Sequence, residues 1–134
     1  MIVADSNLLA YLLLPGPKAA LAEQVFLKDP DWYSPVLWKS EFRNILFAYM
    51  RSQGMPLHIA EGHWNNALTL LGGRTSDVDP SNILVKASAT PLTAYDAEYV
   101  VLAEELGLQL VTSDRQILRH ASHVALKPED FIRV

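Results

Sequence analysis

Cysteine is absent from the 134 residues of this chain, which excludes a disulfide framework and a thiolate metal site. A chain without thiols suits a reducing compartment, and we expect a cytoplasmic protein. Long hydrophobic runs are also lacking. The apolar stretch at the N-terminus already contains Asp5 and is interrupted by Pro15, Gly16 and Pro17. It is too short for a membrane span and lacks the flanks of a signal peptide, so we expect no membrane association.

An excess of positive charge is the third feature that the sequence lacks, since its formal net charge is −4. This argues against a protein that binds nucleic acid simply through a basic surface. Any contact with nucleic acid is therefore expected to be local and assisted by a metal ion. Half of the residues are hydrophobic and 19% are charged, as in packed globular proteins. The length suits one core, and we expect a single domain over residues 1–134.

Apolar periodicity, proline, glycine and capping residues predict strands that alternate with helices. The expected helices are 7–14, 18–28, 35–53, 56–71, a short one from Pro80 to near Pro91, 93–107, 115–120 and a last turn at 127–131. The expected strands are 2–4, 32–34, 74–79, 108–112 and an edge strand at 124–126. Such alternation predicts an α/β fold, a three-layer α/β/α arrangement around a mainly parallel central sheet.

Two aspartates lie where predicted strands end. Asp5 follows residues 2–4, and Asp114 follows residues 108–112. In parallel sheets, ligands bind outside the carboxyl ends of the strands, so both residues are candidates for a functional site. Each also precedes a predicted helix, where a carboxylate can simply cap free backbone N–H groups. Asp96 has a similar alternative, because it follows Thr93 at the spacing of a capping box.

Helical spacing places two further carboxylates on inward faces, because residues three and four apart share one side of a helix. Glu41 shares a face with Leu37, Trp38 and Ile45, away from Lys39 and Arg43. Asp96 likewise shares a face with Tyr99, Val100 and Ala103, whereas Glu98 and Glu105 are expected to point the other way. Neither face offers a lysine or arginine. A carboxylate removed from water requires a cation, several hydrogen bonds or protonation.

Asp5, Glu41, Asp96 and Asp114 can meet above the sheet, where they would repel one another strongly. Two like charges ~4 Å apart cost roughly 4 kcal/mol at an effective dielectric constant near 20, so such a cluster requires a bound cation or partial protonation. Ligands that are all oxygen select a hard cation such as Mg²⁺ or Mn²⁺. A metal in that position can activate water and neutralise phosphate oxygens, which is the chemistry of phosphodiester hydrolysis.

At this point the sequence resembles the PIN-domain family, most closely the VapC-like toxins of toxin–antitoxin pairs. The matching segments are Val3-Ala4-Asp5-Ser6-Asn7, Ser40-Glu41 with Asn44, Thr93-Ala94-Tyr95-Asp96-Ala97 and Leu110-Val111-Thr112-Ser113-Asp114-Arg115. Mapping the family's acidic residues onto these segments gives the same four carboxylates, as metal ligands and catalytic residues. The resemblance implies an endoribonuclease dependent on Mg²⁺ or Mn²⁺, a homodimer, and a co-expressed antitoxin that covers the site.

Asn7, Asn44 and Thr112 are candidates for orienting a carboxylate or a bound water, although each can instead satisfy nearby backbone groups. Arg115, beside Asp114, is the preferred candidate for contact with substrate phosphate, and Ser6 and Ser113 are expected to cap helices. The four histidines show no metal-binding spacing. Aromatic residues of the third helix are expected in the core or in an interface, not in base stacking. They are Trp38, Phe42 and Phe47.

Other acid-dependent folds fit the sequence less well. A haloacid-dehalogenase-type phosphatase requires an aspartate two residues after the first, where this chain has Asn7, and a dinucleotide-binding turn requires glycine after the first strand. A receiver-like module would have paired acids before its phosphorylated aspartate. Two alternatives stay open: a PIN-like domain that binds RNA or a partner with little turnover, and a housekeeping RNA-processing nuclease.

Overall fold

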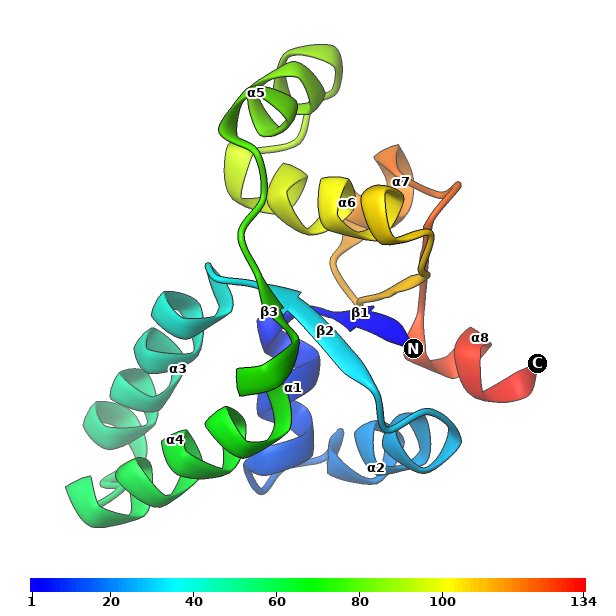
Figure 1. The fold of residues 1–134 in the computed structure, drawn as a ribbon. Helices are drawn as coiled ribbons and strands as arrows, with labels where there is room; N and C mark the ends of the chain where they lie inside the picture. Colours follow the sequence, from blue (N-terminus) through cyan, green and yellow to red (C-terminus); the bar gives the residue numbers. More distant parts are fainter.

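A computed structural model describes all residues from Met1 to Val134, and a five-stranded parallel sheet lies at its centre. The strand order is β3-β2-β1-β4-β5, with helices on both faces (Figure 1). The strands are β1 (Ile2–Ala4), β2 (Trp32–Pro35), β3 (Thr75–Ser76), β4 (Leu110–Val111) and β5 (Ala125–Leu126). The predicted three-layer α/β/α architecture is confirmed, and its sheet is wholly parallel.

The helices divide between the two faces of the sheet (Figure 1). One face is covered by α1 (Ser6–Leu13), α2 (Ala19–Lys28), α3 (Trp38–Gln53), α4 (Leu57–Leu71) and α8 (Pro128–Arg133). The other face is covered by α6 (Ala94–Leu106) and α7 (Arg115–His120), and α5 (Pro80–Ala89) packs against α6. A 3-10 turn, η1 (Gly72–Arg74), leads from α4 into β3.

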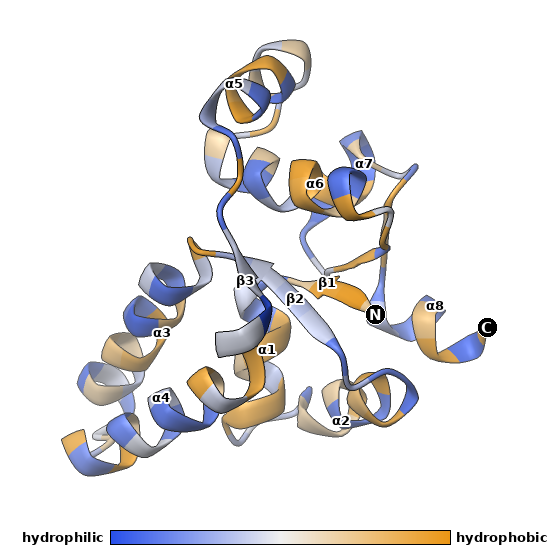
Figure 2. Cartoon of the chain, viewed as in Figure 1, coloured by the Kyte–Doolittle hydropathy of each residue, from blue (hydrophilic) through white to orange (hydrophobic).

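The side-chain alternation of β1 explains why both faces are covered. Successive residues of a strand point to opposite faces, and here Ile2 and Ala4 join one hydrophobic cluster while Val3 joins the other. All three are essentially inaccessible to solvent. Figure 2 shows β1 in the orange of hydrophobic residues. A strand that is apolar on both sides is typical of the centre of a parallel sheet.

The ends of α3 and α6 test the predicted helix boundaries. Gly54 and Gly107 end their helices with φ of 66° and 65°, the left-handed conformation that glycine adopts most easily. The prediction that Pro35 begins α3 is wrong, because Pro35 is the last residue of β2 and the helix begins at Trp38. The ladder with β3 continues past it through a bond of 3.0 Å from the N–H of Val36 to the carbonyl of Ser76.

The prediction that aromatic residues of α3 lie in the core is confirmed for Trp38 and Phe42, and the predicted interface role of Phe47 stays a prediction. Trp38 and Phe42 are fully buried, and the Trp38 ring lies 5.4 Å from that of Trp64 on α4. Phe47, 47% exposed, lies on the outer surface between α3 and α4. No helix is long and apolar enough to cross a membrane.

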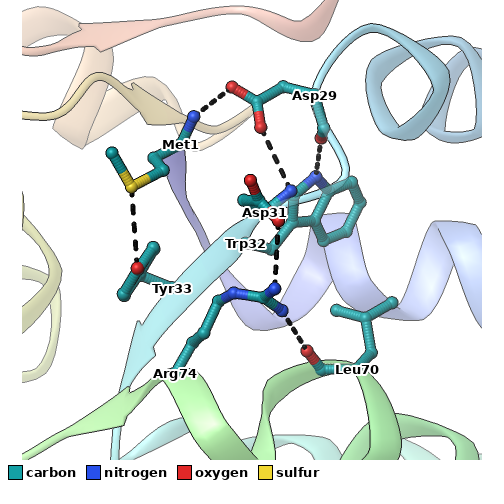
Figure 3. Close-up of polar contacts among 7 residues, drawn as sticks. All are labelled: Met1, Asp29, Asp31, Trp32, Tyr33, Leu70 and Arg74. Atoms are coloured by element: carbon teal, nitrogen blue, oxygen red, sulfur yellow. Dashed lines mark hydrogen bonds and ion pairs between the residues drawn. The ribbon is translucent and has the colours of Figure 1, made fainter.

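Acidic residues at the amino end of the sheet are paired with cations (Figure 3). Asp29 accepts from the terminal amino group of Met1, and Asp31 accepts from the guanidinium of Arg74 at 3.0 Å. The indole of Trp32 adds a bond of 2.8 Å to the carbonyl of Asp29. Acids at this end therefore have the counter-charges that stabilise an exposed loop, which is an ordinary structural role.

Candidate active site

The carboxyl end of the sheet presents the two strand-terminal aspartates at adjacent positions. Asp5 follows β1 and Asp114 comes shortly after β4, and these two strands pair side by side with Ala4 opposite Val111. From β1 the chain proceeds to β2 on one side, and it later returns to add β4 on the other. The site thus lies at the point where the strand order reverses, where open α/β sheets characteristically bind ligands.

Asp5 is the most buried of the four acids, with 6% of its surface exposed. Its Oδ1 accepts from the backbone N–H of Leu8 at 2.8 Å and so caps α1, while Oδ2 accepts from the hydroxyl of Thr112 at 2.5 Å. Burial raises the pKa of Asp5 to about 6, against these two hydrogen bonds, and the charges of Asp114 and Glu41 raise it further. Capping and a place in the acidic site are therefore compatible.

Thr112 joins the two strand-terminal acids. While its hydroxyl donates to Asp5, the same oxygen accepts from the backbone N–H of Asp114 at 3.0 Å. Asp114 in turn caps α7, because its Oδ1 accepts from the N–H of Ile117 at 2.9 Å. Thr112 is fully buried, so its position between β4 and Asp5 is held by the core. This candidate does contact a carboxylate of the site, as the sequence suggested.

Glu41 reaches the site from the first turn of α3 and accepts two hydroxyl groups on one oxygen. Tyr99 of α6 donates to Oε1 at 2.6 Å, and Ser6 of α1 donates to it at 3.1 Å. Burial, together with the negative charge of Glu41, raises the pKa of Tyr99 well above its usual range. The phenol consequently stays protonated and remains a hydrogen-bond donor to Glu41 at all ordinary pH values.

Asp96 lies in the first turn of α6, half-buried. Thr93 caps this helix by accepting from the N–H of Asp96 at 3.1 Å. Burial raises the pKa of Asp96, and the charges of Asp114 and Glu41 raise it further. The charges of Asp114 and Glu41 thus act on both Asp5 and Asp96. A side-chain hydrogen bond with Thr93 lowers the pKa of Asp96, so this threonine both caps the helix and contacts the carboxylate.

The donor set of this site suits a hard divalent cation. It consists of carboxylates, and none of them takes part in the ion pairs of the chain. This contrasts with Asp29 and Asp31 at the other end of the sheet. No three acidic or histidine side chains lie close enough together to form a ready-made metal site. The fit therefore depends on the chemistry of the donors, namely oxygen ligands whose mutual repulsion a divalent cation would relieve.

A hollow of about 250 Å³ opens beside Glu41. It is lined by Leu37, Ser40, Glu41, Asn44 and Tyr95, and the Tyr95 side chain is 65% exposed. Asn44 is thus on the same side as Glu41 and faces solvent.

Two other candidates lie beside the site without a contact to its acids. Asn7 is exposed on α1, two residues after Asp5, and makes no hydrogen bond to a carboxylate. Arg115, the first residue of α7, is exposed next to Asp114.

Two residues at the site, Ser6 and Tyr99, have partners that the sequence did not indicate. Ser6 was expected to cap a helix, but Asp5 provides the cap and Ser6 donates to Glu41. Tyr99 was expected only as an apolar neighbour, although a buried phenol requires a polar partner. Glu98 was expected to point the other way from Asp96; burial raises its pKa, and the charge of Glu41 raises it further. A hydrogen bond with the backbone of Leu37, next to the start of α3, acts in the opposite direction and lowers it.

Comparison with solved structures identifies the fold. The chain resembles PAE2754 from Pyrobaculum aerophilum with a TM-score of 0.78, at 24% identity, over 98% of this chain and 86% of that one. The fold is PIN-like. A toxin–antitoxin complex from Klebsiella pneumoniae matches with a TM-score of 0.68 at 16% identity, over 96% and 98% of the two chains. FitAcB from Neisseria gonorrhoeae matches with a TM-score of 0.70 at 19% identity, over 96% and 99%.

No protein-family model and no curated protein sequence matches the chain. The similarity to known proteins is therefore a similarity of fold.

Proposed function

We propose that this protein is a metal-dependent endoribonuclease and the toxin of a toxin–antitoxin pair. The observation that carries the proposal is the set Asp5, Glu41, Asp96 and Asp114: four carboxylates without cationic partners, electrostatically coupled, at the switch point of a PIN-like sheet. Outside the site, Asp29, Asp31, Glu104 and Asp130 have counter-charges. Acids that burial and mutual repulsion destabilise are retained where a ligand compensates for them, and they are typical of functional sites.

In this proposal, the four carboxylates hold Mg²⁺ or Mn²⁺, which when bound supplies an activated water and neutralises charge on the phosphate. Asp5, fixed at both oxygens by Leu8 and Thr112, provides a rigid anchor at the floor of the site. Glu41, Asp96 and Asp114 line the more accessible side. The attack of water on a phosphodiester would leave a 5′-phosphate and a 3′-hydroxyl, as the family resemblance implies.

The exposed tyrosine at the hollow beside Glu41 is an argument for a single-stranded RNA substrate. An exposed tyrosine ring can stack with a base of any sequence, and Tyr95 lies at this hollow directly beside the acids. Arg115, exposed next to Asp114, can meet a neighbouring phosphate. Since the chain has a net charge of −4, its affinity for RNA is expected to depend strongly on the bound divalent ion.

Cleavage of RNA by the purified protein should require Mg²⁺ or Mn²⁺ and should stop in excess chelator, because four uncompensated carboxylates would repel the phosphate. The measurement is a gel assay of single-stranded and structured RNA, with labelled ends to identify the 5′-phosphate. Restoring the metal should restore cleavage. Equal cleavage in chelator would remove the proposed mechanism, and no cleavage with either ion would favour an RNA- or partner-binding domain with little turnover.

An apolar groove between α3 and α4 suits the antitoxin. It has a volume of about 380 Å³ and is lined by Arg43, Leu46, Phe47, Met50, Leu57, Ala60, Glu61 and Trp64. Glu41 lies on the same helix, α3, in its first turn. An amphipathic antitoxin segment could bury the groove and place a cationic side chain among the acids.

Expression of the chain alone should arrest growth, and co-expression of the adjacent gene should relieve the arrest.

Phe47→Glu should weaken the relief of growth arrest by the antitoxin, because a charge replaces a ring that is 47% exposed in the groove. Leu27→Glu is the matched control, since Leu27 is 83% exposed on α2, outside the groove. Complex formation is measured by co-purification and growth by plating. Equal relief for both variants would place the antitoxin elsewhere. An active nuclease without toxicity would indicate a housekeeping enzyme.

The homodimer stays a prediction, to be checked by light scattering.

A further inference from the structure

Glu41 differs from the other acids in how its carboxylate is held. Asp5 and Asp114 each accept a backbone N–H of the helix that follows them, whereas Glu41 accepts hydroxyl groups from two other helices. Both bonds go to the same oxygen, Oε1, with Tyr99 at 2.6 Å and Ser6 at 3.1 Å. Its second oxygen, Oε2, makes no hydrogen bond to the side chains around it. The carboxylate is therefore fixed on one side and open on the other.

The type of donor matters as much as its position. A lysine or arginine in place of Tyr99 would hold Glu41 as firmly but would cancel the charge needed to attract a cation. Neutral hydroxyls orient a carboxylate without neutralising it. Tyr99 is also rigid, because only 3% of its surface is exposed and its ring packs in the cluster beneath α6. A glutamate side chain has several rotatable bonds, and fixing it beforehand reduces the entropy lost when a ligand binds.

We propose that Tyr99 is a positioning residue, assisted by Ser6, which fixes Oε1 of Glu41 and leaves Oε2 as the oxygen that binds the divalent cation. This inference rests on the proposed function, because it assigns Glu41 to the metal. It also explains why a tyrosine hydroxyl in an otherwise apolar cluster is directed at a carboxylate. A partner that orients a metal ligand is typically worth ~10–100-fold in metal affinity.

The test compares Mn²⁺ affinity, measured by calorimetry on the whole chain, in the parent, Tyr99→Phe and Ser6→Ala. Tyr99→Phe keeps the ring and removes only the hydroxyl, so affinity should fall ~10–100-fold. Ser6→Ala removes the longer bond and should cause a smaller loss. Tyr33→Phe is the matched control, because the Tyr33 hydroxyl contacts only the sulfur of Met1, at 3.6 Å, near the amino end of the sheet (Figure 3). Its affinity should equal that of the parent.

Thermal unfolding separates positioning from packing. A purely structural role for the Tyr99 hydroxyl would lower the melting temperature of Tyr99→Phe equally with and without Mn²⁺. A positioning role instead reduces the increase in melting temperature that Mn²⁺ produces, because a ligand stabilises the native state according to its affinity. If Tyr99→Phe does not fold, Ser6→Ala alone decides: unchanged Mn²⁺ affinity in that variant overturns the proposal.

A double-mutant cycle with Glu41→Gln identifies the route of the effect. If Tyr99 acts through Glu41, adding Tyr99→Phe to Glu41→Gln should cause little further loss of Mn²⁺ affinity. An equal loss in both backgrounds would overturn the proposal, as would unchanged affinity in Tyr99→Phe when the parent binds Mn²⁺. A parent that binds no Mn²⁺ would instead refute the proposed metal dependence itself. These two failures are distinguished by the parent measurement.

Discussion

Asp5→Asn is expected to reduce RNA cleavage at least ~100-fold while the chain stays folded. The carboxylate lies at the centre of the acidic site, 6% exposed, with both oxygens held by Leu8 and Thr112. An asparagine keeps the shape and can still accept the N–H of Leu8, so the cap of α1 survives. The lost charge is the part that a cation requires. The measurement is kcat/KM on a labelled RNA together with circular dichroism of the same sample.

Asp77→Asn is the matched control for this loss, because Asp77 is exposed and lies in the segment between β3 and α5. It makes none of the ion pairs of the chain, and its variant should keep the parent activity. If Asp5→Asn instead unfolded under conditions in which Asp77→Asn did not, Asp5 would be primarily a helix cap. Full activity in Asp5→Asn would remove it from the metal site.

The stability of the metal-free protein should decrease as the pH rises from about 4 to above 6, through the titration of Asp5. Its pKa is raised from 3.8 in a free side chain to about 6 in the fold, chiefly by burial. Between these values the folded state binds the proton more tightly than the unfolded state. The contribution of protonated Asp5 to the stability of the folded state is therefore complete below the pKa of the unfolded chain. It is lost as the pH rises through the pKa of the folded state. About two pKa units correspond to roughly 3 kcal/mol.

The experiment is urea unfolding of the parent and Asp5→Asn in chelator, at several pH values across this window. Asp96 and Glu98, whose pKa values are also raised by burial, contribute in the same direction. The difference in the free energy of unfolding between the parent and Asp5→Asn isolates the contribution of Asp5. The variant should gain stability relative to the parent as pH rises and should level off above about pH 7. A constant difference across the window would show that Asp5 is not strained in the metal-free fold.

The sequence determined those features that depend on neighbouring residues. Gly54 and Gly107 ended their helices because only the local backbone decides a left-handed cap. Thr93, Asp5 and Asp114 capped helices through backbone N–H groups three residues away. The alternation of strands and helices determined the α/β class, and helical spacing placed Glu41 and Asp96 on partly buried faces of their helices. Pro35 was misplaced because the strand pairing that includes it comes from residues 75–76.

Only the tertiary structure decided what lies between these elements. Ser6 and Tyr99 meet at one oxygen of Glu41 although they are 35 and 58 positions away from it, and Thr112 reaches Asp5 across 107 positions. The strand order β3-β2-β1-β4-β5 brought the ends of β1 and β4 together. Helical period and capping chemistry act over a few residues, whereas the pairing of parallel strands and the packing of helices are set by the burial of apolar surface across the whole chain.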